Sequence, residues 1–299
     1  MKRLEDTNLF YTALFGSDER LCGLLLVKNL EGSPSFIDGM DRLILALYDD
    51  GYIEGKASAE HWKWGDMTIL VRRSTPERMS AWIAGAAHWQ PFFQWLNNGE
   101  VLLDRDGYLA NTRNKLDRWP EQLRERRLIS EYSRFLGAYL QAKQNLKDQH
   151  AMDAYTNILA ALNHWAHIAV IEETLHPEPS LWEQVRRVNP GIFKLYDELT
   201  SSGETMEQRV NLVILAVEFA VLTKMKSSSS LLLRILQSRP EPWSLSELQN
   251  HPALSGLHLE LSPLLRKLAH RGYVAEIARG VKEHGLHLLD LRYTASGFE

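Results

Sequence analysis

Residues 40–48 read MDRLILALY, and this nearly unbroken apolar run is typical of a β-strand that is covered on both faces. Two further runs, Gly23–Val27 and Met67–Val71, have the same character. Residues 99–104 predict a last short strand, because loop-forming residues follow them. Residues 1–112 therefore predict a small mixed sheet with flanking helices.

Residues 113–226 are predicted to be almost entirely helical. Apolar residues recur there at three- and four-residue spacing, which places them on one face of a helix. The stripes cover Leu128–Tyr139, Ala154–Ile168, Trp182–Val188 and Val210–Leu222. About four amphipathic helices in this length indicate a helical bundle.

Residues 227–299 have a different order of elements. Ser227–Ser230 marks the boundary, either as a flexible joint or as a helix start. Ser244 predicts the cap of a short helix. The elements expected after it are a helix over Leu259–His270, a strand from Tyr273, a turn at Arg279-Gly280 and a strand over Leu286–Tyr293. Three helices followed by a two-stranded hairpin is the winged helix-turn-helix order.

The composition is that of an ordinary globular protein, with 44% hydrophobic and 24% charged residues among 299. A formal net charge of -4 argues against a protein that coats nucleic acid. The single cysteine, Cys22, excludes an intrachain disulfide and a Cys-rich metal site, and we expect it in the core. The longest apolar runs fall short of the roughly 20 residues that cross a bilayer, so we expect a cytoplasmic protein without a membrane partner.

Three stretches, Phe36–Leu47, Trp95–Arg105 and Asp153–Glu173, carry a resemblance to a known group of proteins. With the order of the three parts, they make the chain resemble an uncharacterised bacterial family of nucleotidyltransferase-like proteins. The resemblance implies a polymerase-β-type nucleotidyltransferase head, a helical domain for substrate binding and a C-terminal helix-turn-helix. The head is also similar to that of kanamycin-type nucleotidyltransferases. The expected fold is α+β, with the head over 1–112, the bundle over 113–226 and the winged helix over 227–299.

The chemistry of that superfamily uses carboxylates on neighbouring strands to hold divalent metal ions. The resemblance places Asp41 at the first metal carboxylate. The second should stand two residues further on, on the same strand face, but that position holds Leu43. Asp38 and Asp66 are the nearest substitutes, and Asp38 would need a turn at Gly39 to join Asp41. The ordinary alternative for all three aspartates is a loop or strand-end position.

The superfamily also uses a Gly-Ser turn that cradles a triphosphate through backbone N–H groups. Gly32 and Ser33 are the candidates here, although the loop from them to Asp41 is shorter than usual, and Lys28 is a further candidate for nucleotide binding. A simple turn is the ordinary alternative. If the head is active, Mg²⁺ is the expected cofactor.

His164 and His167 stand three residues apart on a predicted helix, a spacing that metal ligands use. Because no third ligand of clear geometry lies nearby in the sequence, hydrogen-bonded interior histidines are the favoured interpretation. Aromatic residues of the head could line a base-stacking pocket, but core positions are their usual role. The tryptophans concerned are Trp62, Trp64, Trp82, Trp89 and Trp95.

The candidate DNA contacts lie in the C-terminal part. They are Arg266, Lys267 and Arg271 near the third predicted helix, and Arg279 and Lys282 in the hairpin. Basic and acidic residues are almost equally frequent there, whereas a DNA reader carries a basic footprint. Packing or protein contact is therefore at least as well supported as DNA binding.

Three functions follow from these features. The favoured one is a degenerate nucleotidyltransferase-like protein that binds a nucleotide or another small ligand between head and bundle. The second is an active Mg²⁺-dependent nucleotidyltransferase that modifies a small molecule or a protein. The third is a transcriptional regulator that binds DNA through its C-terminal part. A homodimer is compatible with each of them.

Overall fold

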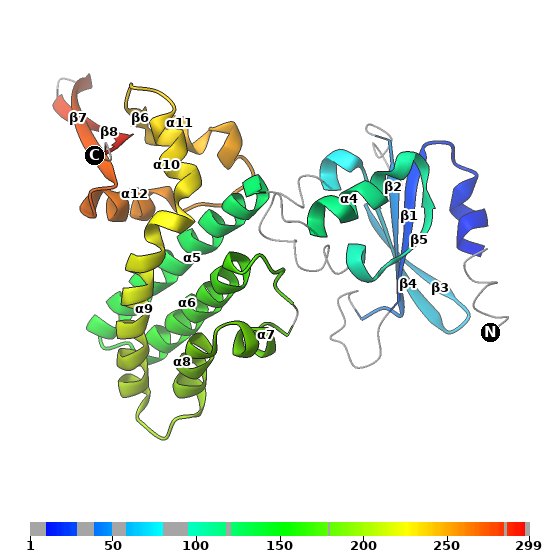
Figure 1. The fold of residues 1–299 in the computed structure, drawn as a ribbon, viewed down its shortest axis with the longest axis horizontal. Helices are drawn as coiled ribbons and strands as arrows, with labels where there is room; N and C mark the ends of the chain where they lie inside the picture. The colour runs from blue at the N-terminus through cyan, green and yellow to red at the C-terminus, as the bar shows by residue number, and fades with distance from the viewer. Residues whose placement is uncertain are drawn as a thin grey trace. The chain divides into compact units, whose positions relative to one another are not determined.

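The computed structural model describes residues 10–28, 39–49, 58–79, 95–117, 121–178, 180–283 and 286–296. The chain divides into two compact units, Met1–Pro120 and Glu121–Glu299. In Figure 1 the first unit contains the five-stranded sheet, and the second contains the long helices and a small sheet.

The first unit is built on a mixed sheet with the strand order β3-β4-β2-β1-β5. The strands are β1 (Leu21–Lys28), β2 (Arg42–Tyr48), β3 (Ala59–Trp64), β4 (Met67–Ser74) and β5 (Glu100–Asp104). β2 and β4 run parallel, and the other pairings of the sheet are antiparallel. The mixed sheet expected from the apolar runs is therefore confirmed.

Helices cover both faces of this sheet, which explains why its central strands are apolar at nearly every position (Figure 1). On one face, the helix over residues 10–16 packs Tyr11 and Phe15 into a cluster with Ile44. On the other face, α4 (Tyr108–Asp117) brings Leu109 against Gly23 of β1. The core of the unit consequently lies in two layers, one on each side of β1 and β2.

Two details of the first unit differ from the expectations. β3 is an additional edge strand, with exposed or half-buried side chains throughout, which the apolar pattern did not predict. Cys22 is half-buried and not in the core, because its Sγ lies 2.8 Å from Asp49 Oδ1 at the end of the neighbouring strand.

The tryptophans of the first unit have mainly packing roles where they are described. Trp62 stacks on Phe15 with 5.6 Å between ring centroids, and Trp95 is 6% exposed. Trp64 is 43% exposed and stacks on Phe10. Trp82 and Trp89 lie outside the described residues.

We expect Gly99→Ala to destabilise the first unit by about 1–3 kcal/mol, the range typical of overpacking. A Cβ atom at this position would lie 2.5 Å from the Trp95 carbonyl oxygen and 2.6 Å from Leu25 Cγ. That carbonyl also accepts a hydrogen bond from Gly99 N at 2.8 Å, so it cannot move away alone. Urea unfolding measures the difference. Gly203→Ala is the control, since nothing lies within 4 Å of the added Cβ there, and equal effects of the two substitutions would contradict the steric explanation.

The second unit begins with a helical bundle. Its helices are α5 (Glu121–Lys147), α6 (Ala151–Glu172), α7 (Leu181–Val188), α8 (Pro190–Ser201) and α9 (Met206–Ser228). The predicted apolar stripes form its core, as Phe135 and Ile158 are fully buried and Phe135 stacks on Trp165. Thr205 begins α9 with a reciprocal cap to Gln208. In the described part of the chain, no helix has both the length and the apolar character needed to cross a membrane.

The rest of the second unit combines short helices with a sheet of order β6-β8-β7. The elements are α10 (Ser230–Gln237), β6 (Trp243–Ser244), α11 (Leu245–Gln249), η2 (Pro252–Leu254), α12 (Leu261–His270), β7 (Val274–Glu283) and β8 (Leu286–Ala295). The predicted cap at Ser244 is confirmed, since its hydroxyl accepts a hydrogen bond from Glu247 N. The predicted turn at Arg279-Gly280 is wrong, because the β7–β8 ladder continues through both residues to Glu283.

The serine-rich segment between these parts is a helix junction. α9 ends at Ser228 and α10 begins at Ser230, and both Ser228 and Ser229 are buried, which settles the two alternatives in favour of a helix start. Contacts that join α5 to the C-terminal elements include the ion pair Glu125–Arg234 and the hydrogen bond from Glu260 N to Ser133 Oγ. The bundle and the C-terminal elements thus form one compact unit. The winged-helix assignment and the three domain boundaries stay predictions.

Candidate functional site

Asp41, the candidate metal carboxylate, lies directly before β2 and binds the neighbouring strand β4. Its Oδ2 accepts hydrogen bonds from Thr68 N and Thr68 Oγ1, each at 2.7 Å, and its own N–H donates to Thr68 O at 3.1 Å. The hydrogen bond from the Thr68 backbone, followed by the one from its hydroxyl, lowers the pKa of Asp41. The carboxylate is therefore ionised at neutral pH and fastens β2 to β4.

The position two residues beyond Asp41 belongs to the core. Leu43 is fully buried, and its partners on the adjacent strands, Val27 and Leu70, are buried as well. Mg²⁺ binds oxygen ligands, and a two-metal site needs carboxylates on one strand face. The described residues of the first unit do not fit such a site, because Leu43 stands where the second carboxylate is needed.

The other candidate residues of the first unit do not complete a metal site in its described part. Asp66 is exposed in the turn between β3 and β4. Lys28 forms a salt bridge with Glu100 of β5, with 2.7 Å between Nζ and Oε2. Among the described residues, neither Asp41 nor Asp66 belongs to a group of three metal-ligating side chains. Asp38, Gly32 and Ser33 lie outside the described residues.

The candidate DNA contacts are placed on α12, directly after it, and on β7. Arg266, Arg271 and Arg279 are exposed, whereas Lys267 is half-buried. Lys282 lies in β7, and its side chain is outside the described part of the chain. The three arginines are therefore accessible to a partner, and exposure alone does not select DNA.

A cluster of ionisable side chains lies inside the bundle, where α5 contacts α6. Glu131 Oε2 is 2.8 Å from His164 Nδ1 and 4.0 Å from His167 Nδ1. One potential ligand atom from each residue lies within 4.8 Å of the others. We call these three residues the Glu–His–His cluster. Within the described residues it is the one group of three with the composition and spacing of a metal site.

The cluster is shielded from solvent and strongly polar. The side chains of Glu131, His167 and His164 are 6%, 13% and 24% exposed. Burial alone would raise the pKa of Glu131, but the hydrogen bond from His164 and the influence of His167 and Arg127 together lower it to about 2. Burial lowers the pKa of His167, and it lowers that of Arg127 to about 10. At neutral pH an ionised carboxylate therefore lies beside a buried arginine cation.

The hydrogen bonds of the cluster fix the position of the histidine protons. A carboxylate and a carbonyl only accept, so Nδ1 of His164 donates to Glu131 and Nδ1 of His167 donates to Asn163 O at 2.9 Å. The neutral ring of each then has its lone pair on Nε2. A proton consequently lies between Glu131 and His164.

The sequence contained the two histidines but did not reveal their partner. Glu131 precedes His164 by 33 residues and belongs to another helix. One signal could have found it, since Glu131 lies within the predicted apolar stripe of α5, one helical turn after Arg127, and both residues are buried. Charged residues are almost never fully buried unless they are paired, so such a pair in a stripe indicates a polar site.

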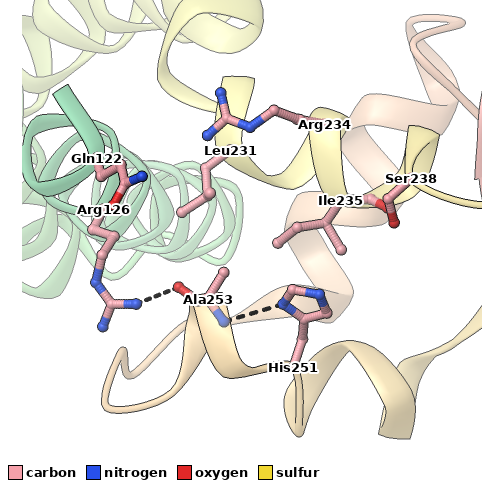
Figure 2. A pocket seen from close by; sticks show the side chains of 8 residues that line it. All are labelled: Gln122, Arg126, Leu231, Arg234, Ile235, Ser238, His251 and Ala253. Atoms are coloured by element: carbon pink, nitrogen blue, oxygen red, sulfur yellow. Dashed lines mark hydrogen bonds between the residues drawn. The ribbon is translucent and has the colours of Figure 1, made fainter.

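A pocket of about 360 Å³ lies elsewhere in the second unit, between the start of α5, α10 and η2 (Figure 2). Figure 2 shows Arg126 donating to the Ala253 carbonyl, while the Ala253 N–H donates to His251 Nδ1. Arg126 also donates to Ser255 O at 2.6 Å, so its guanidinium joins α5 to this loop. The remaining lining residues are Gln122, Leu231, Arg234, Ile235 and Ser238.

Comparisons with known proteins place a domain boundary close to the one between the two compact units, Met1–Pro120 and Glu121–Glu299. Residues 10–124 match the family described as nucleotidyltransferase-like, and residues 125–224 match the YgxA-like substrate binding domain. The uncharacterized protein YgxA of Bacillus subtilis is 27% identical over 251 residues, which cover 84% of each chain. A crystal structure of a nucleotidyltransferase-like protein from Exiguobacterium sibiricum has the same fold, with a TM-score of 0.81, 24% identity, and coverage of 98% of this chain and 99% of that one.

The chain therefore carries a nucleotidyltransferase-like domain followed by a YgxA-like substrate binding domain, and it is homologous to YgxA. Glu131, His164 and His167 all lie within the matched substrate binding domain, whereas seven of the eight residues that line the pocket in Figure 2 lie outside it. The Glu–His–His cluster is consequently the better candidate for the functional site of this domain.

Proposed function

We propose that this protein is a nucleotidyltransferase-like protein that binds a nucleotide or another small molecule and does not transfer nucleotidyl groups. The observation that carries the proposal is the burial of Leu43, two residues after Asp41 in β2. Two-metal catalysis needs a second carboxylate on that strand face. Asp41 has a structural use instead, as the acceptor of two hydrogen bonds from Thr68.

The helical domain supports the binding part of the proposal. It matches a substrate binding domain, and its interior holds ionised and hydrogen-bonding groups whose burial has no obvious purpose in a bundle core. Small-molecule sites combine apolar walls with a few polar groups that fix the ligand. Glu131, His164 and Arg127 are groups of that kind.

Two measurements on the full chain test the proposal. Incubation with α-labelled ATP and Mg²⁺ or Mn²⁺ should give wild type and Asp41→Ala the same background incorporation. Thermal unfolding should show stabilisation by a nucleotide or small ligand, because binding to the folded state adds about 2.7 kcal/mol at a ligand concentration 100 times Kd. His164→Ala should reduce this stabilisation and Asp41→Ala should not. Metal-dependent labelling that disappears in Asp41→Ala would establish an active transferase instead.

For the C-terminal elements we propose a winged helix that contacts protein and not DNA. The order α10, β6, α11, α12, β7, β8 fits that fold. Its hairpin carries exposed apolar side chains, with Leu289 at 69%, Leu291 at 46% and Ile277 at 38% exposure. Exposed apolar groups favour protein contact, whereas phosphate contacts need a basic surface.

A further inference from the structure

We infer that the Glu–His–His cluster binds a divalent transition-metal ion, with Glu131, His164 and His167 as its protein ligands. The site lies within the second unit and does not depend on the chemistry of the first. It also differs in place and in ligand type from the Mg²⁺ site that the resemblance implies around Asp41.

The spacing of the ligand atoms is close to what an ion needs. Bonds of about 2.0–2.2 Å from Zn²⁺ to nitrogen and oxygen put neighbouring tetrahedral ligands roughly 3.4 Å apart. The distances from Glu131 Oε2 to the Nδ1 atoms of His164 and His167, 2.8 and 4.0 Å, lie on either side of that value. Changes of roughly half an ångström, which side-chain rotations provide, would bring these two distances to that value, and potential ligand atoms of all three residues already lie within 4.8 Å of one another.

The packing of two helices holds these ligands in place. α6 presents His164 and His167 three residues apart, on the side of the helix that meets α5, and α5 supplies Glu131 from across that contact. Because the cluster is largely buried, an ion there would meet protein atoms on most sides. Three protein ligands and one remaining position is the composition of catalytic and substrate-binding zinc sites.

Binding can proceed without a change in the charge of the histidines. Each neutral ring would move its proton from Nδ1 to Nε2, and the ion would take the place of the proton between Glu131 and His164. His167 would exchange its hydrogen bond to Asn163 O for the metal bond. The ion adds two positive charges to a cluster in which Arg127 already balances Glu131, so the remaining position would favour an anionic group.

The ligand types select the class of ion. Imidazole nitrogen suits Zn²⁺, Co²⁺, Ni²⁺ and Fe²⁺, whereas Mg²⁺ and Ca²⁺ prefer sites made of oxygen atoms. Two imidazoles and one carboxylate therefore favour the first group.

The test uses the full chain without a histidine tag, stripped with EDTA and dialysed. Calorimetric titration with Zn²⁺ alone should show one ion per chain, and Co²⁺ should give the visible absorption of a four- or five-coordinate site with nitrogen ligands. His164→Ala and His167→Ala should each weaken binding by at least about tenfold. His150→Ala, an exposed histidine beside the start of α6, is the matched control and should bind as wild type does.

Circular dichroism of each variant separates lost binding from lost folding. If the alanine variants unfold, Glu131→Gln keeps the side-chain shape and should still weaken Zn²⁺ binding at least tenfold while the helical signal is kept. Absence of stoichiometric uptake by the wild type would overturn the inference. Equal binding by wild type and the His164→Ala/His167→Ala double variant would overturn it as well. Displacement of bound Zn²⁺ by Mg²⁺ at equal concentration would contradict the assigned ligand set.

Discussion

Glu131→Ala is expected to lower the free energy of unfolding of the second unit by about 3–5 kcal/mol, the range for leaving a buried charge uncompensated. The substitution leaves Arg127, which is 2% exposed, without the carboxylate that balances its charge. It also leaves Nδ1 of His164 without its 2.8 Å acceptor. The two losses add to each other, because each leaves a polar group desolvated inside the bundle.

The measurement has to report on the bundle alone, since a chain of two units need not unfold in one step. Hydrogen exchange of peptides from α5 and α6, followed through a urea series, gives that local free energy. Glu204→Ala, an exposed glutamate before α9, is the control and should stay within about 0.5 kcal/mol of wild type. Glu131→Gln should lose less than Glu131→Ala, because its carbonyl oxygen still accepts from His164.

A double substitution separates charge from packing at the same position. Glu131→Met together with Arg127→Met removes both charges and keeps the volume, so it should recover much of the loss seen in Glu131→Met alone. If Glu131→Ala cost less than about 1 kcal/mol, the interaction between the charges of Glu131 and Arg127 would contribute little to stability.

The sequence predicted the strands of the first unit where burial dictated the pattern. β1 and β2 are covered on both faces, so their residues are apolar almost without interruption. β3 pairs only with β4 at the sheet edge, and its sequence AEHWKW has no buried side chain. A strand without a buried face leaves no apolar period, and β3 was consequently missed. The misplaced turn at Gly280 has a related cause, since Arg-Gly indicates a turn by composition while the ladder depends on partners in β8.

The candidate site was predictable only in part, for a physical reason. The spacing of His164 and His167 is local and visible in the sequence, whereas their contact with Glu131 arises from the packing of α5 on α6. The interpretation as hydrogen-bonded interior histidines is confirmed, because His164 bonds to Glu131 and His167 bonds to Asn163 O. Glu131 is also a side chain of a metal-ligating type that the sequence did not place there. For Asp41 the local sequence argued against a metal site, because the residue two places on is Leu43. In the structure, β2 is buried from Leu43 onward.

Leu43→Asp is expected to unfold the first unit, with a loss greater than about 4 kcal/mol. The substitution would supply a carboxylate two residues after Asp41, the spacing that two-metal chemistry uses. Leu43 is fully buried between Val27 of β1 and Leu70 of β4, so the new carboxylate would replace apolar contacts and meet no hydrogen-bond partner on its strand neighbours. Burying an ionised group without a partner costs several kcal/mol beyond the lost packing.

Leu43→Asn is the matched control, because it has the same shape as aspartate without the charge and should destabilise less. Urea unfolding in the presence and absence of millimolar Mg²⁺ then distinguishes two explanations of the incomplete metal motif. Either the site lacks only the second carboxylate, or the surroundings of position 43 cannot hold an ion at all. If only the carboxylate were lacking, Mg²⁺ would stabilise Leu43→Asp in proportion to its concentration and not Leu43→Asn, and labelling from ATP would appear. We expect no such rescue, because the surroundings of position 43 are packed as a core and Asp41 is held by Thr68. In that case the lack of a second metal ligand is a property of the whole strand face, and no single substitution can reverse it.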